Sequence, residues 1–578
     1  MYGSGQPTGL GNGGFHSSQE VNNADVRAAS SGNNQEVCLS VASLQDNQSH
    51  QQQTFAHFSQ PRKKRRFITS SSATNGCRKP SGCQCCLLVS SILTVVVSIA
   101  MLAGGFRLIF DAIMKTQMEV REGSKSFEMW KTTPFPLILN LYIWNITNHE
   151  EFLNGSKPVL KECGPYVWRE YHDKQGIEFH PNETVTYLQQ RWWIWDEQLS
   201  GRNSLDDAVY TMNPIPLSAA WSVRHYPAWM RPIAFRSLNG LFNGMAEQAV
   251  VKTTVNELVF TGFQDPVLDW IQKEIIAEDG KWHGVLPLIN LSHQVSLDYS
   301  QIGWFLQRNM SLYYDGVFNM MTGSDDLKNV GKIDLWNYTR ETTFFDSPCN
   351  SVVGSAGEFF QPDLQRDKIE FYSSDLCMSM KLEYQKDIDH SGLQAYRFWG
   401  SNHTFANGSV VPGNDCYCVK GTCAPTGLLN AESCRMGSPA FISFPHYFNA
   451  DPFLLDQIEG LSPAEDKHAF IMDIMPETGT PVNVNARMQI NMRVTPYTGK
   501  GTGKIDILTK VPDIYLPMVW FEELAEVPED MVGQLKALQF ITSTPVMTIS
   551  FSVLLLIGIG TLVCVVFVCL RRGKLPTV

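Results

Sequence analysis

Two long apolar segments constrain this chain more than any other feature. Residues 87–106 (LLVSSILTVVVSIAMLAGGF) hold no charged side chain over twenty positions, and residues 546–570 form a second apolar run of twenty-five. A helix rises 1.5 Å per residue, so about 20 residues cross the roughly 30 Å hydrocarbon layer of a bilayer. A buried core helix is the alternative for one such run, but a run near each end favours two membrane spans. The first run also starts too late for a secretory signal peptide.

The flanking charges predict the orientation of the spans. Residues 1–82 carry a net charge of +4 and residues 571–578 a net charge of +3, although the whole chain carries −11. Cytosolic flanks of membrane spans are enriched in Lys and Arg. We therefore expect a disordered cytosolic tail (1–82), spans at 83–110 and 546–570, an extracellular or lumenal part (111–545) and a cytosolic tail (571–578). The expected location is the plasma membrane, with an endosomal or lysosomal pool in addition.

Glycosylation sequons support this topology. Eight Asn-x-Ser/Thr sites lie between the spans, whereas Asn47, on the cytosolic side, is expected to stay unmodified. The eight candidates are Asn145, Asn154, Asn182, Asn290, Asn309, Asn337, Asn402 and Asn407.

The cytosolic edge of the first span has its own signals. Residues 61–67 (PRKKRRF) suit attraction to anionic lipid, although such a run can also serve only to fix topology. Four nearby cysteines are candidates for S-palmitoylation, with reduced thiols as the alternative. They are Cys77, Cys83, Cys85 and Cys86.

The part between the spans has mostly strand periodicity. Apolar side chains alternate with mostly polar ones over 482–494, and 140–147 and 184–195 also read as strands. Helices are predicted at 228–245 and after Asp265-Pro266, where Asp can cap a helix that begins with Pro. The pattern indicates an α+β fold.

The cysteines between the spans suggest disulfides rather than a metal site. Six cluster late in the sequence, and their spacing does not match common zinc sites. They permit fifteen pairings, and Cys163 is left over as a buried free thiol. No HExxH or G-x-S-x-G motif occurs, so we expect neither an enzyme, a metal nor a cofactor. The acidic balance argues against nucleic-acid binding. The six cysteines are Cys349, Cys377, Cys416, Cys418, Cys423 and Cys434.

A series of short motifs resembles the class B scavenger receptor family over about residues 83–570. In order, these motifs are FEMW (127–130), CGPYVWR (163–169), DP (265–266), FYSSDLC (371–377), YRF (396–398), CYC (416–418), PAFISFPHY (439–447) and DI (473–474).

The resemblance implies a specific architecture. It implies two transmembrane helices flanking a large antiparallel β-barrel ectodomain, with an apical helical bundle and an internal hydrophobic tunnel. It also implies three disulfides: Cys349–Cys416, Cys377–Cys434 and Cys418–Cys423.

The same resemblance implies a receptor that binds lipids or lipid particles and transfers lipid through the tunnel to the membrane. Its partners would be a fatty acid, a sterol, a carotenoid or a lipoprotein-borne lipid, the bilayer, and protein ligands at the apex. The alternatives are a cargo or adhesion receptor without lipid flux and, more remotely, a two-span ion channel. Residues 241–248 have Gly and Ala where relatives carry lysines. The candidates for the lipid entrance are therefore Trp229, Arg231, Arg236, Leu238 and Phe242. The alternative is that the apolar side chains only pack the helical bundle and the arginines are solvated.

Overall fold

A computed structural model describes residues 82–271, 273, 300–499, 503–542 and 544–571. The chain divides into two units, residues 1–78 and 79–578, and every described residue belongs to the second unit. The predictions for residues 1–81, for Cys77 and for Asn290 lie outside the described residues, as do those for the side chain of Cys83 and for residues 572–578.

Two described helices are long and apolar enough to cross a membrane, Cys85–Met118 and Pro545–Arg571. The first consists of α1 (Gly82–Ala100), a π-helical turn η1 (Met101–Gly105) and α2 (Phe106–Met118), and the second is α12 (Thr544–Arg571), preceded by α11 (Glu529–Thr542). The first helix continues beyond the predicted end of the span at residue 110. An i,i+4 ion pair between Arg107 and Asp111 (3.7 Å) suits a helix that continues past the apolar run.

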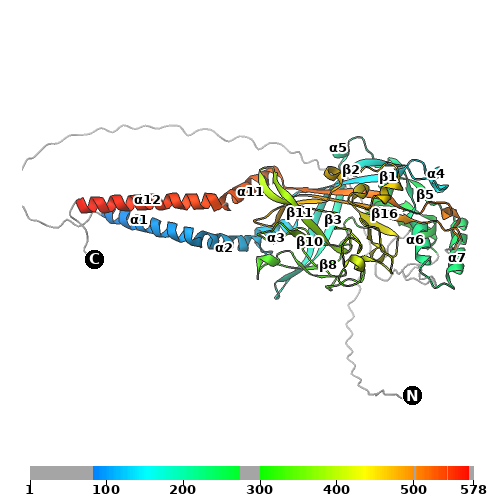
Figure 1. Ribbon diagram of the computed structural model, residues 1–578, viewed down its shortest axis with the longest axis horizontal. Coiled ribbons are helices and arrows are strands. Elements are labelled where there is room, and N and C mark those ends of the chain that lie inside the picture. Colours follow the sequence, from blue (N-terminus) through cyan, green and yellow to red (C-terminus); the bar gives the residue numbers. More distant parts are fainter. Residues whose placement is uncertain (1–81, 272, 274–299, 500–502, 543, 572–578) are drawn as a thin grey trace, which may run out of the picture. The chain divides into compact units, whose positions relative to one another are not determined.

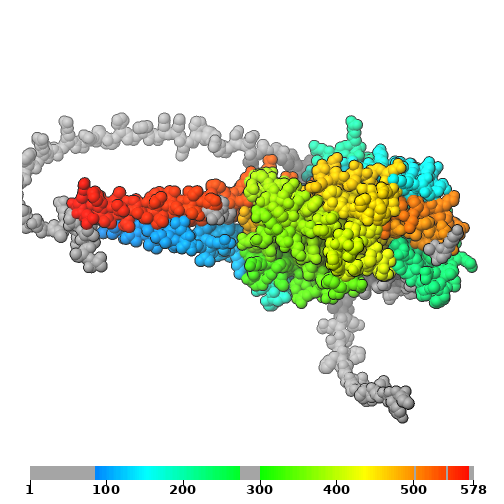
Figure 2. Space-filling model, in the orientation of Figure 1, coloured from blue at the N-terminus to red at the C-terminus, as the bar shows by residue number. Residues whose placement is uncertain are grey.

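Helices α1 and α12 pack against each other along their length (Figures 1 and 2). Small side chains make this close approach possible. Ser91 and Ser98 are buried in α1, and a Cβ atom on Gly558 of α12 would lie 3.0 Å from Cγ2 of Val95. Small residues at a helix contact are typical of helices that associate within a bilayer.

Most described strands form one large antiparallel sheet of thirteen strands, two of them off the main path. Along the main path the order is β10 (Lys368–Ser373), β11 (Met378–His390), β12 (Leu393–Trp399), β15 (Ile471–Met475), β16 (Thr480–Val494), β17 (Ile514–Glu526), β1 (Leu137–Ile146), β2 (Leu160–His180), β3 (Thr184–Trp195), β8 (Val317–Met321) and β9 (Ile333–Trp336).

The two ends of this sheet come close to each other. Ser355 forms one bridge to Lys332, beside β9, and another to Phe371 in β10, so the sheet is nearly closed. Two apolar helices flanking a large antiparallel sheet are what we predicted, and this part of the fold prediction is confirmed.

Apart from two helices described below and several 3₁₀ and π-helical turns, the remaining described elements are short. They comprise β13 (Leu429–Asn430) and β14 (Ala440–Ser443) beside β16, the pairs β4 (Ala208–Met212) with β5 (Val250–Thr254) and β6 (Phe263–Gln264) with β7 (Gln301–Ile302), and the helices α3 (Lys125–Lys131), α4 (His149–Leu153), α5 (Glu197–Ser200), α8 (Pro266–Trp270), α9 (Phe453–Asp456) and α10 (Glu465–His468).

Local sequence signals located several elements well. The predicted strands 140–147, 184–195 and 482–494 correspond to β1, β3 and β16. Asp265 caps α8 as predicted, because its Oδ1 atom accepts hydrogen bonds from the backbone N–H groups of Val267 (3.0 Å) and Leu268 (3.1 Å).

The polar face of β16 differs from the usual solvent-facing side of an alternating strand. Gln489 and Asn491 are fully buried, and both donate to Oγ of Ser443 in β14 (3.4 and 3.0 Å). Arg487 is also buried and donates to Glu522 of β17 (2.7 Å). These buried polar side chains are satisfied by hydrogen bonds to one another and to residues of the paired strands β14 and β17, and the backbone N–H of His446 also donates to Gln489 (2.9 Å).

Candidate functional site

Two helices, α6 (Pro214–Val223) and α7 (Arg231–Gly244), lie at the end of the sheet far from α1 and α12 (Figure 1). We call them the apical helices. Asn213 caps α6, since its Oδ1 atom accepts from the backbone N–H of Ile215 (3.0 Å), and Pro214 follows at the first helical position. Helix α7 lies within the predicted range 228–245.

One face of α7 belongs to the protein core. Phe235, Leu238 and Phe242 are at most 5% exposed and pack in the largest apolar cluster of the described residues. The structure therefore places two of the five candidates for the lipid entrance, Leu238 and Phe242, inside the core rather than at the surface. Their spacing along the helix is that of a face that packs against the rest of the fold.

The loop between β16 and β17 holds α7 in place. Asn239 and Asn243 both donate to Oδ2 of Asp506 (2.9 and 3.0 Å). Lys504 and these two amides hold the pKa of Asp506 well below its usual range. Gly503 lies directly against the ring of Phe235, where a Cβ atom would clash, so this position requires glycine.

The opposite side of α7 presents an unusual set of exposed groups. Trp229, just before the helix, is 73% exposed, and Ile233 is 65% exposed. Arg236 is exposed, whereas Arg231 is half-buried. The Nε atom of Arg231 is buried and has no hydrogen-bond partner among the described residues. A buried guanidinium N–H without a partner is costly, and because neighbouring atoms cover this one, an outside acceptor can reach it only after they move.

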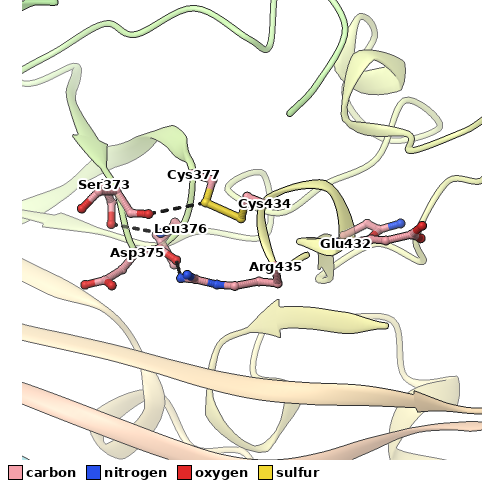
Figure 3. Close-up of a disulfide and its surroundings, with 9 residues drawn as sticks. Ser373, Asp375, Leu376, Cys377, Glu432, Cys434 and Arg435 are labelled. Carbon is pink, nitrogen blue, oxygen red and sulfur yellow. Dashed lines mark hydrogen bonds between the residues drawn. A yellow bond between two sulfur atoms is a disulfide. The ribbon is translucent and has the colours of Figure 1, made fainter. Parts of the chain in front are cut away.

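Helix α6 is fixed by a buried carboxylate. Glu432 is 2% exposed and accepts from Trp221 Nε1 of α6 (2.9 Å) and from Lys420 Nζ (2.7 Å). Two residues later Cys434 forms a disulfide with Cys377, and Arg435 donates to the backbone carbonyl of Asp375 (Figure 3). The apical helix is thereby linked to the disulfide-bonded part of the chain.

Six cysteines form three bonded pairs in the structure, and the pairs are those that the resemblance implies. The bonds join Cys349 to Cys416, Cys377 to Cys434 and Cys418 to Cys423, with Cα–Cα distances of 5.6, 6.3 and 4.2 Å. Those distances suit or closely approach the range of natural disulfides. The pairing itself remains a prediction that peptide mapping can check.

The other cysteines of interest differ in exposure. Cys85 and Cys86 have exposed side chains at the start of α1, as a site of S-palmitoylation requires. Cys163 is free and half-buried rather than fully buried, and burial raises the pKa of its thiol.

Most described sequons lie on the surface. The asparagines at 154, 182, 309, 337 and 402 are exposed, whereas Asn145 and Asn407 are half-buried. The Nδ2 atom of Asn407, to which a glycan attaches, donates to the backbone carbonyl of Ala424 (3.0 Å). Nδ2 of the exposed Asn154 likewise donates to the carbonyl of Glu150 (2.9 Å), so the half-buried position, not the hydrogen bond alone, sets Asn407 apart from it.

We therefore expect unequal glycan occupancy. Site-resolved mass spectrometry before and after glycosidase treatment should find glycans at the five exposed asparagines and little or none at Asn407, whose amide is both half-buried and bonded. Asn47 should be unmodified. A glycan at Asn47 would contradict the proposed orientation, and full occupancy of Asn407 would show that this hydrogen bond opens before modification.

Acidic and histidine side chains also meet inside the sheet. Glu170, His172 and Glu523 lie close together, with His172 Nε2 at 2.7 Å from Glu170 Oε1. Burial and the charge of Glu170 raise the pKa of Glu523 to about 8. Arg191 lies 3.7 Å from Glu170 and pairs with Asp315 at 2.6 Å. We interpret this group as part of a buried ion-pair network.

Comparison with known proteins defines the family. The model of the CD36 family matches residues 88–570, which include both apolar helices and the whole sheet. The chain belongs to the CD36 family. Its relatives include the protein peste of Drosophila melanogaster (32% identical over 450 residues, 76% of each chain) and scavenger receptor class B member 1 of Rattus norvegicus (31% over 483 residues, 83% of this chain and 87% of the relative). Lysosome membrane protein 2 of Homo sapiens is 28% identical over 467 residues, 79% of this chain and 89% of the relative.

Membership of the CD36 family confirms the resemblance and the two-span membrane class. Two of these relatives are named as a scavenger receptor and a lysosome membrane protein. The structure brings several of the family's motifs together in space, although they lie far apart in the sequence.

The motifs 396–398 and 473–474 meet in an ion pair. Arg397 in β12 binds Asp473 in β15 through two hydrogen bonds of 2.7 Å, and Asp473 is fully buried. The motif 439–447 likewise reaches the start of 163–169. Its His446 lies 2.7 Å from Glu162 and stacks on His468 with ring centres 4.0 Å apart, a contact that the separate sequence positions did not indicate.

Proposed function

We propose that this protein is a lipid receptor of the plasma membrane, with both termini in the cytosol, that captures lipid at the apical helices and passes it along the interior of the nearly closed sheet to the bilayer. The observation that carries the proposal is the exposure of Trp229, just before α7, and of Ile233 in α7, together with the exposed Arg236 and the half-buried Arg231 of the same helix. An amphiphile matches this combination, because its chain can cover the apolar side chains while its headgroup accepts from the guanidinium.

Energetics make a protein conduit useful. Exposing a methylene to water costs about 0.8 kcal/mol, so twelve methylenes of an acyl chain cost roughly 10 kcal/mol. A continuous apolar path lowers that barrier without an energy source, and the flux then follows the lipid gradient. Class B scavenger receptors among the relatives support a lipid-related role. Extraction of lipid from the purified protein followed by mass spectrometry would identify the bound class.

The two apical arginines provide the functional test. In an Arg231→Ala, Arg236→Ala double variant, uptake of acidic lipid should fall several-fold while uptake of a neutral lipid of equal chain length holds. The reason is that only the acidic headgroup needs the guanidinium groups. The measurement is uptake of both lipids by cells with equal amounts of protein at the surface.

A matched control replaces two exposed arginines elsewhere, Arg202→Ala and Arg340→Ala, and should leave both uptakes unchanged. Wild-type uptake of both lipids by the apical double variant would place the entrance elsewhere. Binding of a protein ligand at the apex with no lipid flux in the wild type would favour the cargo or adhesion receptor instead.

A further inference from the structure

Three buried polar side chains join the ends of three helices near the apex. Asn213 precedes α6, Glu247 follows α7, and Asp265 precedes α8. All three are at most 5% exposed. We call this group the apical triad.

The hydrogen bonds of the triad bring two carboxyl groups together. The Nδ2 atom of Asn213 donates to Oε1 of Glu247 (2.6 Å) and to Oδ2 of Asp265 (2.9 Å). Glu247 Oε1 also accepts from the backbone N–H of Gln248 (3.2 Å). Asp265 Oδ1 is occupied by the cap of α8. One amide therefore bridges two carboxyl groups in a site from which water is largely excluded.

The remaining oxygen of Glu247 shows which group holds a proton. Oε2 of Glu247 is buried and has no hydrogen-bond partner among the described residues. An ionised oxygen in that position, facing a second carboxylate, would combine an unsatisfied charge with like-charge repulsion. A protonated Glu247 removes the charge and can donate to Asp265, as neighbouring carboxyl groups that share one proton do.

We propose that Glu247 and Asp265 share a proton that holds the ends of α6, α7 and α8 together, so that the contact between the apical helices weakens as this proton is lost. The shared proton affects the stability of the apical helices, and this effect does not depend on lipid being the ligand.

The charges around Glu247 support this assignment. Burial, and then the charge of Asp265, raise the pKa of Glu247 to about 8. On the described elements packed against it, Asp265 at the start of α8 is the charged group that acts on Glu247, while α6 contributes the neutral Asn213 and the chain before β5 contributes the N–H of Gln248. None of these neighbours is a cation that would stabilise two carboxylates.

The sign of the pH dependence follows from the shift. A carboxyl whose pKa is higher in the closed form than in the open, solvated form binds more protons when closed. The closed form therefore loses stability as the pH rises from about 4.5 to about 8, and the loss levels off above that range. With these two values, the opening equilibrium constant increases by up to roughly a hundredfold between pH 6 and pH 9.

Hydrogen-exchange mass spectrometry of the full-length protein in detergent tests whether the shared proton holds the apical helices together. After correction for the intrinsic pH dependence of exchange, peptides from the start of α6, the end of α7 and the start of α8 should lose protection by tenfold or more between pH 6 and pH 9. Peptides from β16 and β17 should not. In Glu247→Gln the amide replaces the shared proton, and the pH response of the apical peptides should disappear.

Two further variants keep the test decisive. Asp265→Asn retains a side-chain acceptor for the cap of α8 but removes the second charge, so it should weaken the response, while burial of Glu247 preserves part of it. Glu257→Gln is the matched control, because Glu257 is a neighbouring carboxylate whose pKa is lowered by hydrogen bonds from Thr254, and this variant should keep the full response. No pH response in the wild type, or an unchanged response in both triad variants, would overturn the proposal.

Discussion

Replacing Arg397 with leucine is expected to abolish delivery of the folded protein to the cell surface. The change leaves the carboxylate of Asp473, which is fully buried, without its bidentate partner and with only Asn483 Nδ2 (2.9 Å) as a side-chain donor. Breaking a buried ion pair from one side typically costs about 3–5 kcal/mol, a large part of the stability of a domain. Surface biotinylation and thermal unfolding of the purified variant measure the effect.

The chain provides a matched control for this experiment. Arg366 binds Asp387 with the same two-bond geometry, at 3.0 and 2.9 Å, but both side chains are more than half exposed. Arg366→Leu should therefore leave surface expression and the unfolding temperature almost unchanged, because water replaces the lost bonds. Equal damage from the two substitutions would show that burial of Asp473 is not what makes Arg397 important.

Removal of the long-range disulfides should be the second large effect, and it should depend on loop length. Cys377 and Cys434 are 57 positions apart, whereas Cys418 and Cys423 are only 5 apart. In the chain-entropy account, the longer loop contributes about 4 kcal/mol and the short one about 2 kcal/mol. Cys377→Ala, Cys434→Ala should thus lower the midpoint of denaturation well below that of Cys418→Ala, Cys423→Ala.

Peptide mapping under non-reducing conditions accompanies these measurements. It should recover Cys377 linked to Cys434 in the wild type. A different partner for Cys377 would refute the pairing, and an equal loss of stability in the two double variants would contradict the dependence on loop length.

The sequence predicted the elements whose signals are local. Apolar length located both long helices, alternation located β1, β3 and β16, and the Asp265-Pro266 pair located the start of α8. The burial of Gln489 and Asn491 was not predictable in the same way, because alternation describes the faces of a strand but not what covers them. Their hydrogen-bond partners come partly from Ser443 of β14, which pairs with β16 but lies about 50 positions away along the chain.

In the candidate site, too, the sequence predicts features that depend on neighbouring residues but not contacts between residues far apart in the chain. Helical spacing located α7, but it grouped Leu238 and Phe242 with Trp229 as candidates for the lipid entrance, although the first two pack in the core and Trp229 is exposed just before the helix. The orphan Nε atom of Arg231 and the bridge from Asn213 to two carboxyl groups depend on atoms brought together by the fold. No spacing rule in one sequence gives such contacts.

The position of β17 in the sheet has a consequence for how the protein is made. Strand β17 lies between β1 and β16, and Ile143 of β1 pairs with Val519 of β17, far apart along the chain. At the usual 5–20 residues per second, a ribosome needs roughly 20–80 s to proceed from one to the other. Throughout that interval β1 exposes a free edge, a hazard for pairing with the wrong chain. The nascent protein should therefore depend on chaperones until the last strand has been made, immediately before the second apolar helix.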